Sequence, residues 1–437
     1  SAEVGFKSTY FLTVTARNDW PSQLAGPHSN RKSFFYPSVG LSVVISELFD
    51  NMPKNLEYIK VRASYASVGT AFERYIANPK FKWDESGLQW SVQTLYPMYD
   101  LKPELTNSLE VGLTMRFLKN FNLDLTYYRT NTLNQTFNPK ISTGSGSSEI
   151  YIQSGDVRNQ GVEFTLGYGN EWGIFGWNTN YTLSMNQNRI MKLADNVLNH
   201  ATGEYISVDM IDMNGLGRAH FILKEGGTLG DLYSLADFKY DSNGNIYFSQ
   251  DGNLAIENIA SPKDYVKLGC VLPKANMAWR NDFHVGNFNF GFLITARIGG
   301  VVYSKTQAVL DSYGVSEASA DARDFGGVLI NGGRDLVDAN NWYAKVGGSN
   351  PLPQKYTYSA TNVRLQEASI GYTFPRKMLG DVCDLTLSLV GRNLWMIYNK
   401  APFDPESIAT TGNYYQGIDN FMMPSLRNFG FNVRLTF

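Results

Sequence analysis

The sequence lacks most features that mark a protein's class at once. Among 437 residues there are only two cysteines, Cys270 and Cys383, which are too few for disulfide bonds to stabilise so long a chain. The 38 lysines and arginines nearly balance the 40 aspartates and glutamates, so no nucleic-acid partner is expected. No apolar run approaches the roughly 18 residues that a membrane-spanning helix needs. A disulfide scaffold, a nucleic-acid-binding protein and a helical membrane protein are therefore not expected.

Clusters of residues that carry chemistry are also scarce. The four histidines are scattered and show no metal-site spacing. Asp241–Asn245 resembles the start of a calcium loop, but Ile246 and Gly252 stand where an EF-hand needs Gly and Glu. A turn rich in Asn and Gly accounts better for this stretch. We therefore expect no catalytic residue, no metal site, no cofactor and no enzyme activity.

What the sequence has is period-two alternation. In its last ten residues, Asn428–Phe437, apolar and polar side chains alternate without a break. Side chains alternate in this way in a strand whose two faces meet different surroundings. The pattern returns in about twelve segments, each near the length that a tilted strand needs to cross a bilayer. The expected fold class is all-β.

The connections between these segments are of two kinds. The long ones cover residues 18–33, 69–104, 133–156, 190–273, 301–360 and 399–427. Short turns alternate with them, which in an up-and-down antiparallel transmembrane β-barrel places all long loops at one rim. Thr228–Tyr240 also looks extended, and we assign it to a long loop because one more membrane strand would break the alternation. The pattern predicts one barrel domain and no second domain.

One face of the predicted strands is polar and is expected to line the barrel lumen. A charge on the lipid-facing side would cost roughly 2–4 kcal/mol at the bilayer midplane. In a wide barrel such charges more often pair with one another or with a plug than catalyse a reaction. The predicted lumen-facing residues are Glu110, Arg116, Asp124, Glu163, Arg280, Asp282, His284, Arg297 and Arg434.

Several short stretches carry a family resemblance. They are Leu12–Trp20, Tyr36–Ser42, Ile59–Tyr65, Leu101–Glu110, Asn159–Glu163, Gly391–Leu394 followed by Asp404–Glu406, and Pro424–Phe437. The sequence resembles the C-terminal part of SusC/RagA-like TonB-dependent transporters of the Bacteroidetes outer membrane. The stretches follow one another in the same order as in that family, from one end of the chain to the other.

The resemblance implies a 22-stranded barrel filled by an N-terminal plug. This chain would supply about the last twelve strands, without the plug and the first strands. The implied location is the bacterial outer membrane, surrounded by lipid. The implied partners are the remaining N-terminal barrel and plug segment, TonB acting through that plug, and a SusD-like surface lipoprotein that caps the long-loop rim. The implied function is import of oligosaccharides or peptides.

Aromatic residues in the long loops are the predicted substrate contacts, because flat rings stack on sugars or on peptide side chains. They are Trp83, Trp90, Tyr96, Tyr99, Trp342, Tyr343, Tyr356, Tyr414 and Tyr415. The alternative for each ring is packing within the loops or against a partner.

Two other functions stay open at this point. A self-contained twelve-stranded barrel could act as a passive pore or a hydrolase, although a hydrolase would need a Ser-His pair placed by the strands, and no such pairing is evident. A surface barrel could also use its long loops only to bind partners.

Overall fold

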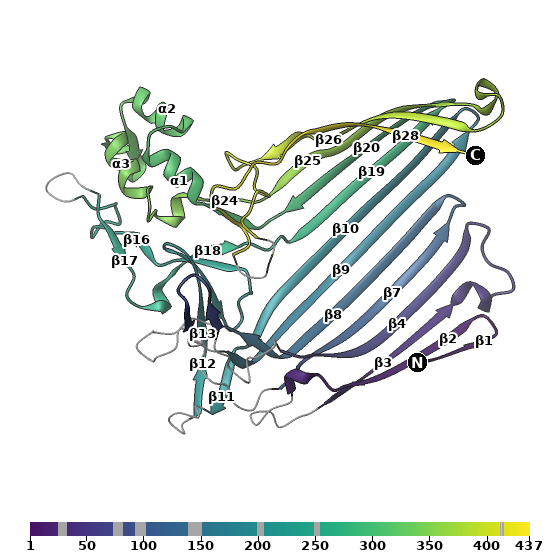
Figure 1. Cartoon of the computed structure of the whole chain (residues 1–437), viewed down its shortest axis with the longest axis horizontal. Helices are drawn as coiled ribbons and strands as arrows, with labels where there is room; N and C mark the ends of the chain where they lie inside the picture. Colours follow the sequence, from purple (N-terminus) through teal and green to yellow (C-terminus); the bar gives the residue numbers. More distant parts are fainter. Residues whose placement is uncertain are drawn as a thin grey trace.

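The computed structural model describes residues 1–24, 33–72, 82–91, 102–138, 151–198, 205–248, 254–410, 412 and 415–437. Its main feature is one sheet of 13 strands that follow one another in chain order (Figure 1). Each strand runs antiparallel to its neighbours. The strands are β1 (Ala2–Phe6), β2 (Tyr10–Asp19), β3 (Phe34–Val44), β4 (Leu56–Thr70), β7 (Glu104–Phe117), β8 (Phe121–Phe137), β9 (Ile152–Trp172), β10 (Phe175–Lys192), β19 (Ala275–Val285), β20 (Phe288–Ile298), β25 (Asn362–Phe374), β26 (Asp384–Asn399) and β28 (Asn428–Thr436). The all-β, up-and-down prediction is confirmed.

Two details of the sheet differ from the sequence-based expectation. Strand β1 was not predicted, because its five residues are too few for an alternating pattern to stand out. Strands β8 and β9 continue into the range 133–156 that was assigned to a loop, and β9 reaches 21 residues. A tilted strand needs only about 9–11 residues to cross a bilayer, so both strands are longer than a bilayer crossing requires.

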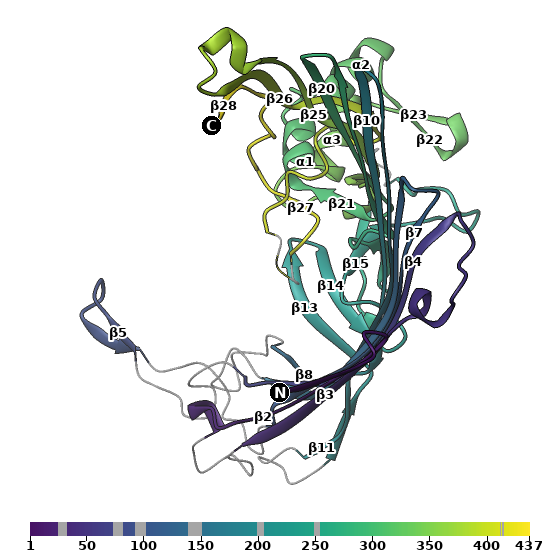
Figure 2. The same ribbon diagram turned by 90° about the vertical axis from the view of Figure 1, so that its right-hand side faces the viewer.

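The large sheet curls but does not close within the described residues. Figure 2 shows the sheet bent along its width, with a concave and a convex side. Among the described strands, β1 pairs only with β2 and β28 pairs only with β26. The structure is therefore a curved wall with two free edges. A self-contained twelve-stranded barrel would need those edges to pair with each other.

The connections separate to opposite ends of the wall (Figure 1). At one end are short turns, such as the two residues between β9 and β10, where Gly173 adopts a positive φ of 64°. At the other end the long connections fold into small sheets of their own. Thr228–Tyr240 lies there, as expected, and contributes two short strands. The strands in this region are β5 (Lys82–Asp84), β6 (Gln89–Ser91), β11 (Ala194–Leu198), β12 (Tyr205–Val208), β13 (Met210–Leu216), β14 (Ala219–Lys224), β15 (Asp231–Ser234), β16 (Ala236–Phe238), β17 (Ile256–Asn258), β18 (Val266–Cys270), β21 (Val301–Ser304), β22 (Val328–Ile330), β23 (Asp335–Val337), β24 (Thr357–Ser359) and β27 (Ile418–Asp419).

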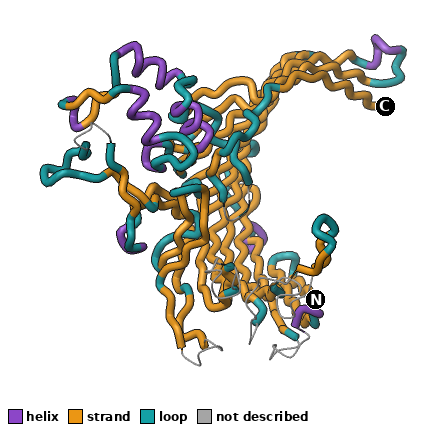
Figure 3. Tube along the Cα trace, turned by 60° about the vertical axis from the view of Figure 1, so that its left-hand side comes forward, coloured by secondary structure: helices purple, strands orange, loops and turns teal. Residues whose placement is uncertain are grey.

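Three α-helices lie together outside the large sheet (Figure 3). They are α1 (Lys305–Ser312), α2 (Glu317–Phe325) and α3 (Ala339–Val346). Each begins at a residue whose side chain accepts a hydrogen bond from a backbone N–H of the first turn, namely Ser304, Ser316 and Asp338. None of the described helices is both long and apolar enough to cross a membrane.

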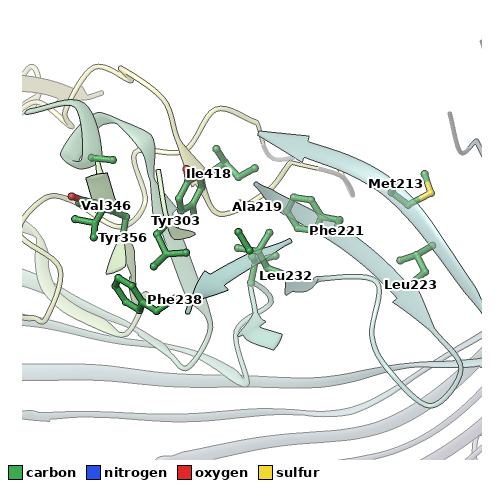
Figure 4. Close-up of a cluster of buried hydrophobic side chains, with 14 of the residues drawn as sticks. Met213, Ala219, Phe221, Leu223, Leu232, Phe238, Tyr303, Val346, Tyr356 and Ile418 are labelled. Carbon is green, nitrogen blue, oxygen red and sulfur yellow. The ribbon is translucent and has the colours of Figure 1, made fainter. Parts of the chain in front are cut away.

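The apolar core of the molecule lies mainly among the long connections. Side chains from β13, β14, β15, β16, β21, β22, β23, β27, α1 and α3 join in one buried cluster, and we call these elements the surface block. Phe137, Val157 and Ile190 of the wall strands β8, β9 and β10 belong to the same cluster, so the block packs onto the wall. Phe221, Leu232 and Tyr303 at the centre of the cluster are 0% exposed (Figure 4). On the large sheet, by contrast, apolar residues such as Leu109 and Val111 stay 44% and 43% exposed. The wall therefore keeps an uncovered apolar face, as lipid contact requires.

Gly161 of β9 occupies a position where a side chain does not fit. A Cβ atom there would lie 2.0 Å from the Met185 carbonyl oxygen and 2.7 Å from the Tyr128 hydroxyl oxygen. We expect Gly161→Ala to destabilise the wall by about 1–3 kcal/mol, because the Met185 carbonyl belongs to the β9–β10 ladder. The folded fraction, read from the resistance of β9 and β10 to added protease, measures this effect.

The matched control is Gly40→Ala in β3. A Cβ atom at residue 40 would lie 3.8 Å from the Ser64 Cβ, which is an ordinary contact. This variant should stay within about 0.5 kcal/mol of the unaltered protein. Equal folded fractions for the two variants would contradict the packing described for Gly161.

Candidate functional site: the polar wall and its rim

Antiparallel strand partners point to the same face of a sheet, so the register decides which residues share a face. Gly112 lies opposite Thr126, which lies opposite Glu163, and the series continues through Ser184 and Asn276 to Arg297. Traced in this way, all the predicted lumen-facing residues fall on one face, up to Arg434 opposite Thr386. That this face lines a lumen stays a prediction.

Charges on the polar face are neutralised by neighbours on other strands. The Arg62 guanidinium of β4 contacts both carboxylate oxygens of Asp124 on β8, at 2.9 and 3.0 Å. It also donates to the hydroxyls of Thr114 and Thr126. A Cβ atom on Gly112 would lie 2.5 Å from this guanidinium, so the arginine lies flat against the wall over the glycine.

A second charge network crosses β19, β25 and β26. Arg280 Nε lies 2.8 Å from Asp282, and Arg280 Nη1 lies 3.5 Å from Glu367. Arg392 Nε lies 3.0 Å from the same Glu367. These side chains are partly exposed, so each pair contributes about 0.2–1 kcal/mol at most. The two networks neutralise part of the charge on the wall, which stays hydrophilic.

The polar face contains two depressions. One of about 210 Å³ is lined in part by Phe11, Lys60 and Glu110. The other, of about 340 Å³, is lined in part by Asn122 and Asn178. Both lie at or below the lower end of the size range of small-molecule pockets, and their lining is more polar than usual. In the described part of the chain, no group of three or more His, Cys, Asp or Glu residues could hold a metal ion.

The predicted aromatic contacts differ in accessibility. Trp83 and Trp90 face each other across the β5–β6 hairpin with ring centroids 5.3 Å apart, and they are 42% and 64% exposed. Trp342 stacks on Phe238 and is 5% exposed, and Tyr356 is 2% exposed. Burial in the surface block favours a packing role for these last two rings, which was the alternative interpretation.

The remaining aromatic candidates are partly buried or outside the description. Tyr343 is partly buried and donates a hydrogen bond from its hydroxyl to the Ala318 carbonyl at 3.2 Å. Tyr415 packs edge-on against Phe221 with ring centroids 6.2 Å apart. Tyr96, Tyr99 and Tyr414 lie outside the described residues. Substrate contact stays a prediction for the whole set.

At the long-loop end of the polar face, the last long connection is anchored to the wall. Arg364 of β25 has a side chain only 5% exposed, and its Nη2 lies 2.8 Å from Asp404 and 3.2 Å from Glu406. Asp404 also accepts a hydrogen bond from Ser425. We call residues 400–410 and 415–427 the anchored loop. Its yellow trace runs on the concave side of the sheet (Figure 2), so the polar face that holds Arg364 is the concave face.

Burial acts to raise the pKa of the Asp404 carboxyl, but hydrogen bonds from Arg364 and Ser425 outweigh it and hold the pKa below its ordinary value. A carboxylate with a lowered folded pKa stabilises its contacts above the unfolded pKa of about 3.9 and loses this effect as pH falls through the folded value. We therefore expect the anchored loop to resist proteolysis at neutral pH and to be released only below about pH 4.

Cleavage of this loop by proteases active at acid and at neutral pH measures that dependence. In Asp404→Asn the acid-induced increase in cleavage should be reduced, because the titrating group is gone. Release of the loop between about pH 5 and 7 would assign the dependence to another group.

The sequence analysis missed the anchor. It recognised Asp404–Glu406 as part of a family resemblance but gave the two carboxylates no role. It also gave Arg364 no role, although this residue follows the predicted connection 301–360 and lies near the start of β25. Alternation alone does not distinguish a buried arginine from an exposed one. The partners of Arg364 could not be identified from the sequence, because the first of its two carboxylates lies 40 residues later in the chain.

Comparison with known proteins places these features in a family. The model of the family described as TonB dependent receptor-like, beta-barrel matches residues 2–394. TonB-dependent receptor P3 of Formosa agariphila is 26% identical over 467 residues, which cover 99% of this chain and 44% of the relative. TonB-dependent receptor P39 of the same bacterium is 25% identical over 495 residues, which cover 97% and 44%. The chain thus spans less than half the length of these curated relatives.

Solved structures share the fold. The RagAB peptide importer in its closed-closed state matches all of this chain and 47% of the solved chain, with a TM-score of 0.75 and 16% identity. In its open-open state the match covers 46% of the solved chain, with a TM-score of 0.74. At this level of identity the likeness concerns the fold.

Proposed function

The chain belongs to the family of TonB-dependent receptor-like β-barrels, and from this premise we propose that it forms the C-terminal wall of an importer for oligosaccharides or peptides. Members of this family lie in the bacterial outer membrane. The observation that carries the proposal is the two-sided wall, with a concave polar face of paired charges and an uncovered apolar face. Such a wall suits the passage of a hydrophilic solute through a lipid layer.

We propose that the importer works by binding and gated release, with no covalent step. The surface block and the anchored loop stand at the outer rim, where a SusD-like surface lipoprotein would deliver the solute. Residues outside this chain would supply the first strands and a plug, and TonB would pull on that plug. The fold shared with a peptide importer supports peptides as one solute class, and the exposed Trp83–Trp90 pair is compatible with sugars.

Uptake by intact cells tests the proposal. Cells that carry the full-length transporter would be supplied with fluorescent oligosaccharides and peptides, with and without a functional TonB. We expect uptake of one solute class that depends on both the transporter and TonB. Equal uptake without TonB would point to a passive pore and overturn the proposal. A lipoprotein that co-purifies with the transporter would support the delivery step.

A further inference from the structure

The anchored loop is attached to the rest of the molecule at two separate places. The first is the Arg364 anchor on the wall, where Asn393 of β26 also donates to the Leu426 carbonyl at 3.2 Å. The second is the surface block, where β27 adds to β21 as a parallel strand and pairs Tyr303 with Ile418. Arg364 and β21 lie far from the loop in sequence, whereas Asn393 lies in the strand that precedes it. The loop therefore bridges the wall and the block.

The second attachment is buried as well as hydrogen-bonded. The Ser304 hydroxyl donates to an Asp419 carboxylate oxygen at 2.6 Å, and Ser304 is 0% exposed while Asp419 is 5% exposed. The same serine caps α1. Ile418 is 2% exposed and belongs to the apolar cluster of the block. Release of the loop would therefore break this hydrogen bond, a strand pair and part of the core together.

We propose that the anchored loop is a fixed part of the rim that does not open during transport, and that it sets the upper size limit of the imported solute. This inference rests on the proposed import function. Because the loop lies on the concave side of the wall (Figure 2), it occupies space at the outer opening. Arg364 is then a positioning residue that acts on the solute through the loop.

A disulfide between the loop and the block tests whether the loop opens. Ser304 and Asp419 are register partners in adjacent strands, which suits the Cα separation of a disulfide. In the full-length transporter, Ser304→Cys with Asp419→Cys should form this bond on intact cells. We expect the oxidised double variant to import solute within about twofold of its reduced form. The single variant Ser304→Cys, treated with the same oxidant, is the matched control.

Two results would overturn the proposal. If oxidation stops import and reduction restores it, while the single variant is unaffected, the loop must open during transport. If the disulfide does not form on intact cells, the loop is not held beside the block as described. Disulfide formation is read by peptide mapping and does not depend on import, so it separates failure of this proposal from failure of the import function.

Arg364→Ala tests the size limit. Against a series of oligosaccharides or peptides of increasing length, the variant should import longer members than the unaltered transporter does. Arg376→Ala, which removes a 44% exposed arginine paired with Asp384 beside a short turn at the other end of the wall, should leave the length limit unchanged. An unchanged limit in Arg364→Ala, together with faster cleavage of the released loop, would show that the loop does not set the size limit.

Discussion

Replacing Arg364 by alanine is expected to weaken the attachment of the anchored loop by about 3–5 kcal/mol. The guanidinium is 5% exposed and serves two carboxylates, so its removal leaves Asp404, whose side chain is 10% exposed, as a buried charge without its main partner. At about 1.4 kcal/mol for each factor of ten, cleavage of the loop by external protease should accelerate by roughly 10²- to 4 × 10³-fold. The initial cleavage rate on intact cells measures this change.

Arg392→Ala separates this effect from a general loss of positive charge. Arg392 also pairs with a carboxylate on the polar face, but its side chain is 66% exposed. Exposed pairs contribute about 0.2–1 kcal/mol, so its loss should change the cleavage rate less than tenfold. If both variants accelerate cleavage alike, burial of the Arg364 pair is not what holds the loop.

Phe221→Ala is expected to cost about 3–5 kcal/mol in the stability of the surface block. Phe221 is 0% exposed at the centre of the apolar cluster and also supports the ring of Tyr415. Truncation leaves a cavity that the surrounding short strands, drawn from separate loops, cannot easily fill. Protease resistance of residues 205–248 measures the loss, and β26, which contributes no residue to this cluster, should keep its resistance.

Leu329→Ala is the matched control for this truncation. Leu329 belongs to the same block but is 51% exposed, so its loss should change stability by less than about 0.5 kcal/mol. If Phe221→Ala unfolds the whole wall as well as the block, the destabilisation extends beyond Phe137, Val157 and Ile190, the wall residues that belong to the same apolar cluster.

Alternation predicted the wall because it follows directly from the two-faced environment of each strand. It assigned Glu110, Asp124 and Arg280 to one face, and the register agrees. The alternation pattern could not predict which residues pair with these charges. Arg62 and Asp124, for example, lie 62 residues apart in sequence. They meet only because β4, β7 and β8 pair side by side in a particular register.

The surface block was beyond prediction for a different reason. Helices α1, α2 and α3 have only eight or nine residues each, and such short helices are marginal without tertiary packing. Eight or nine residues also span little more than about two helical turns, too few for a helical period to stand out in the sequence. Likewise, the loop aromatics Trp342 and Tyr356 look like exposed rings in the sequence, and only the assembled core shows that they are buried.

The pairing of β21 with β27 also constrains the order of folding. It joins residues 303 and 418, and β25 and β26 lie between them in the chain. Contacts between such distant residues form slowly, because a long stretch of chain must first be ordered. The block is therefore expected to complete only after these wall strands have assembled. The resistance of the block to protease would then report on the assembly of the wall. A chain whose wall strands have not all assembled would leave the apolar residues of the block exposed to solvent.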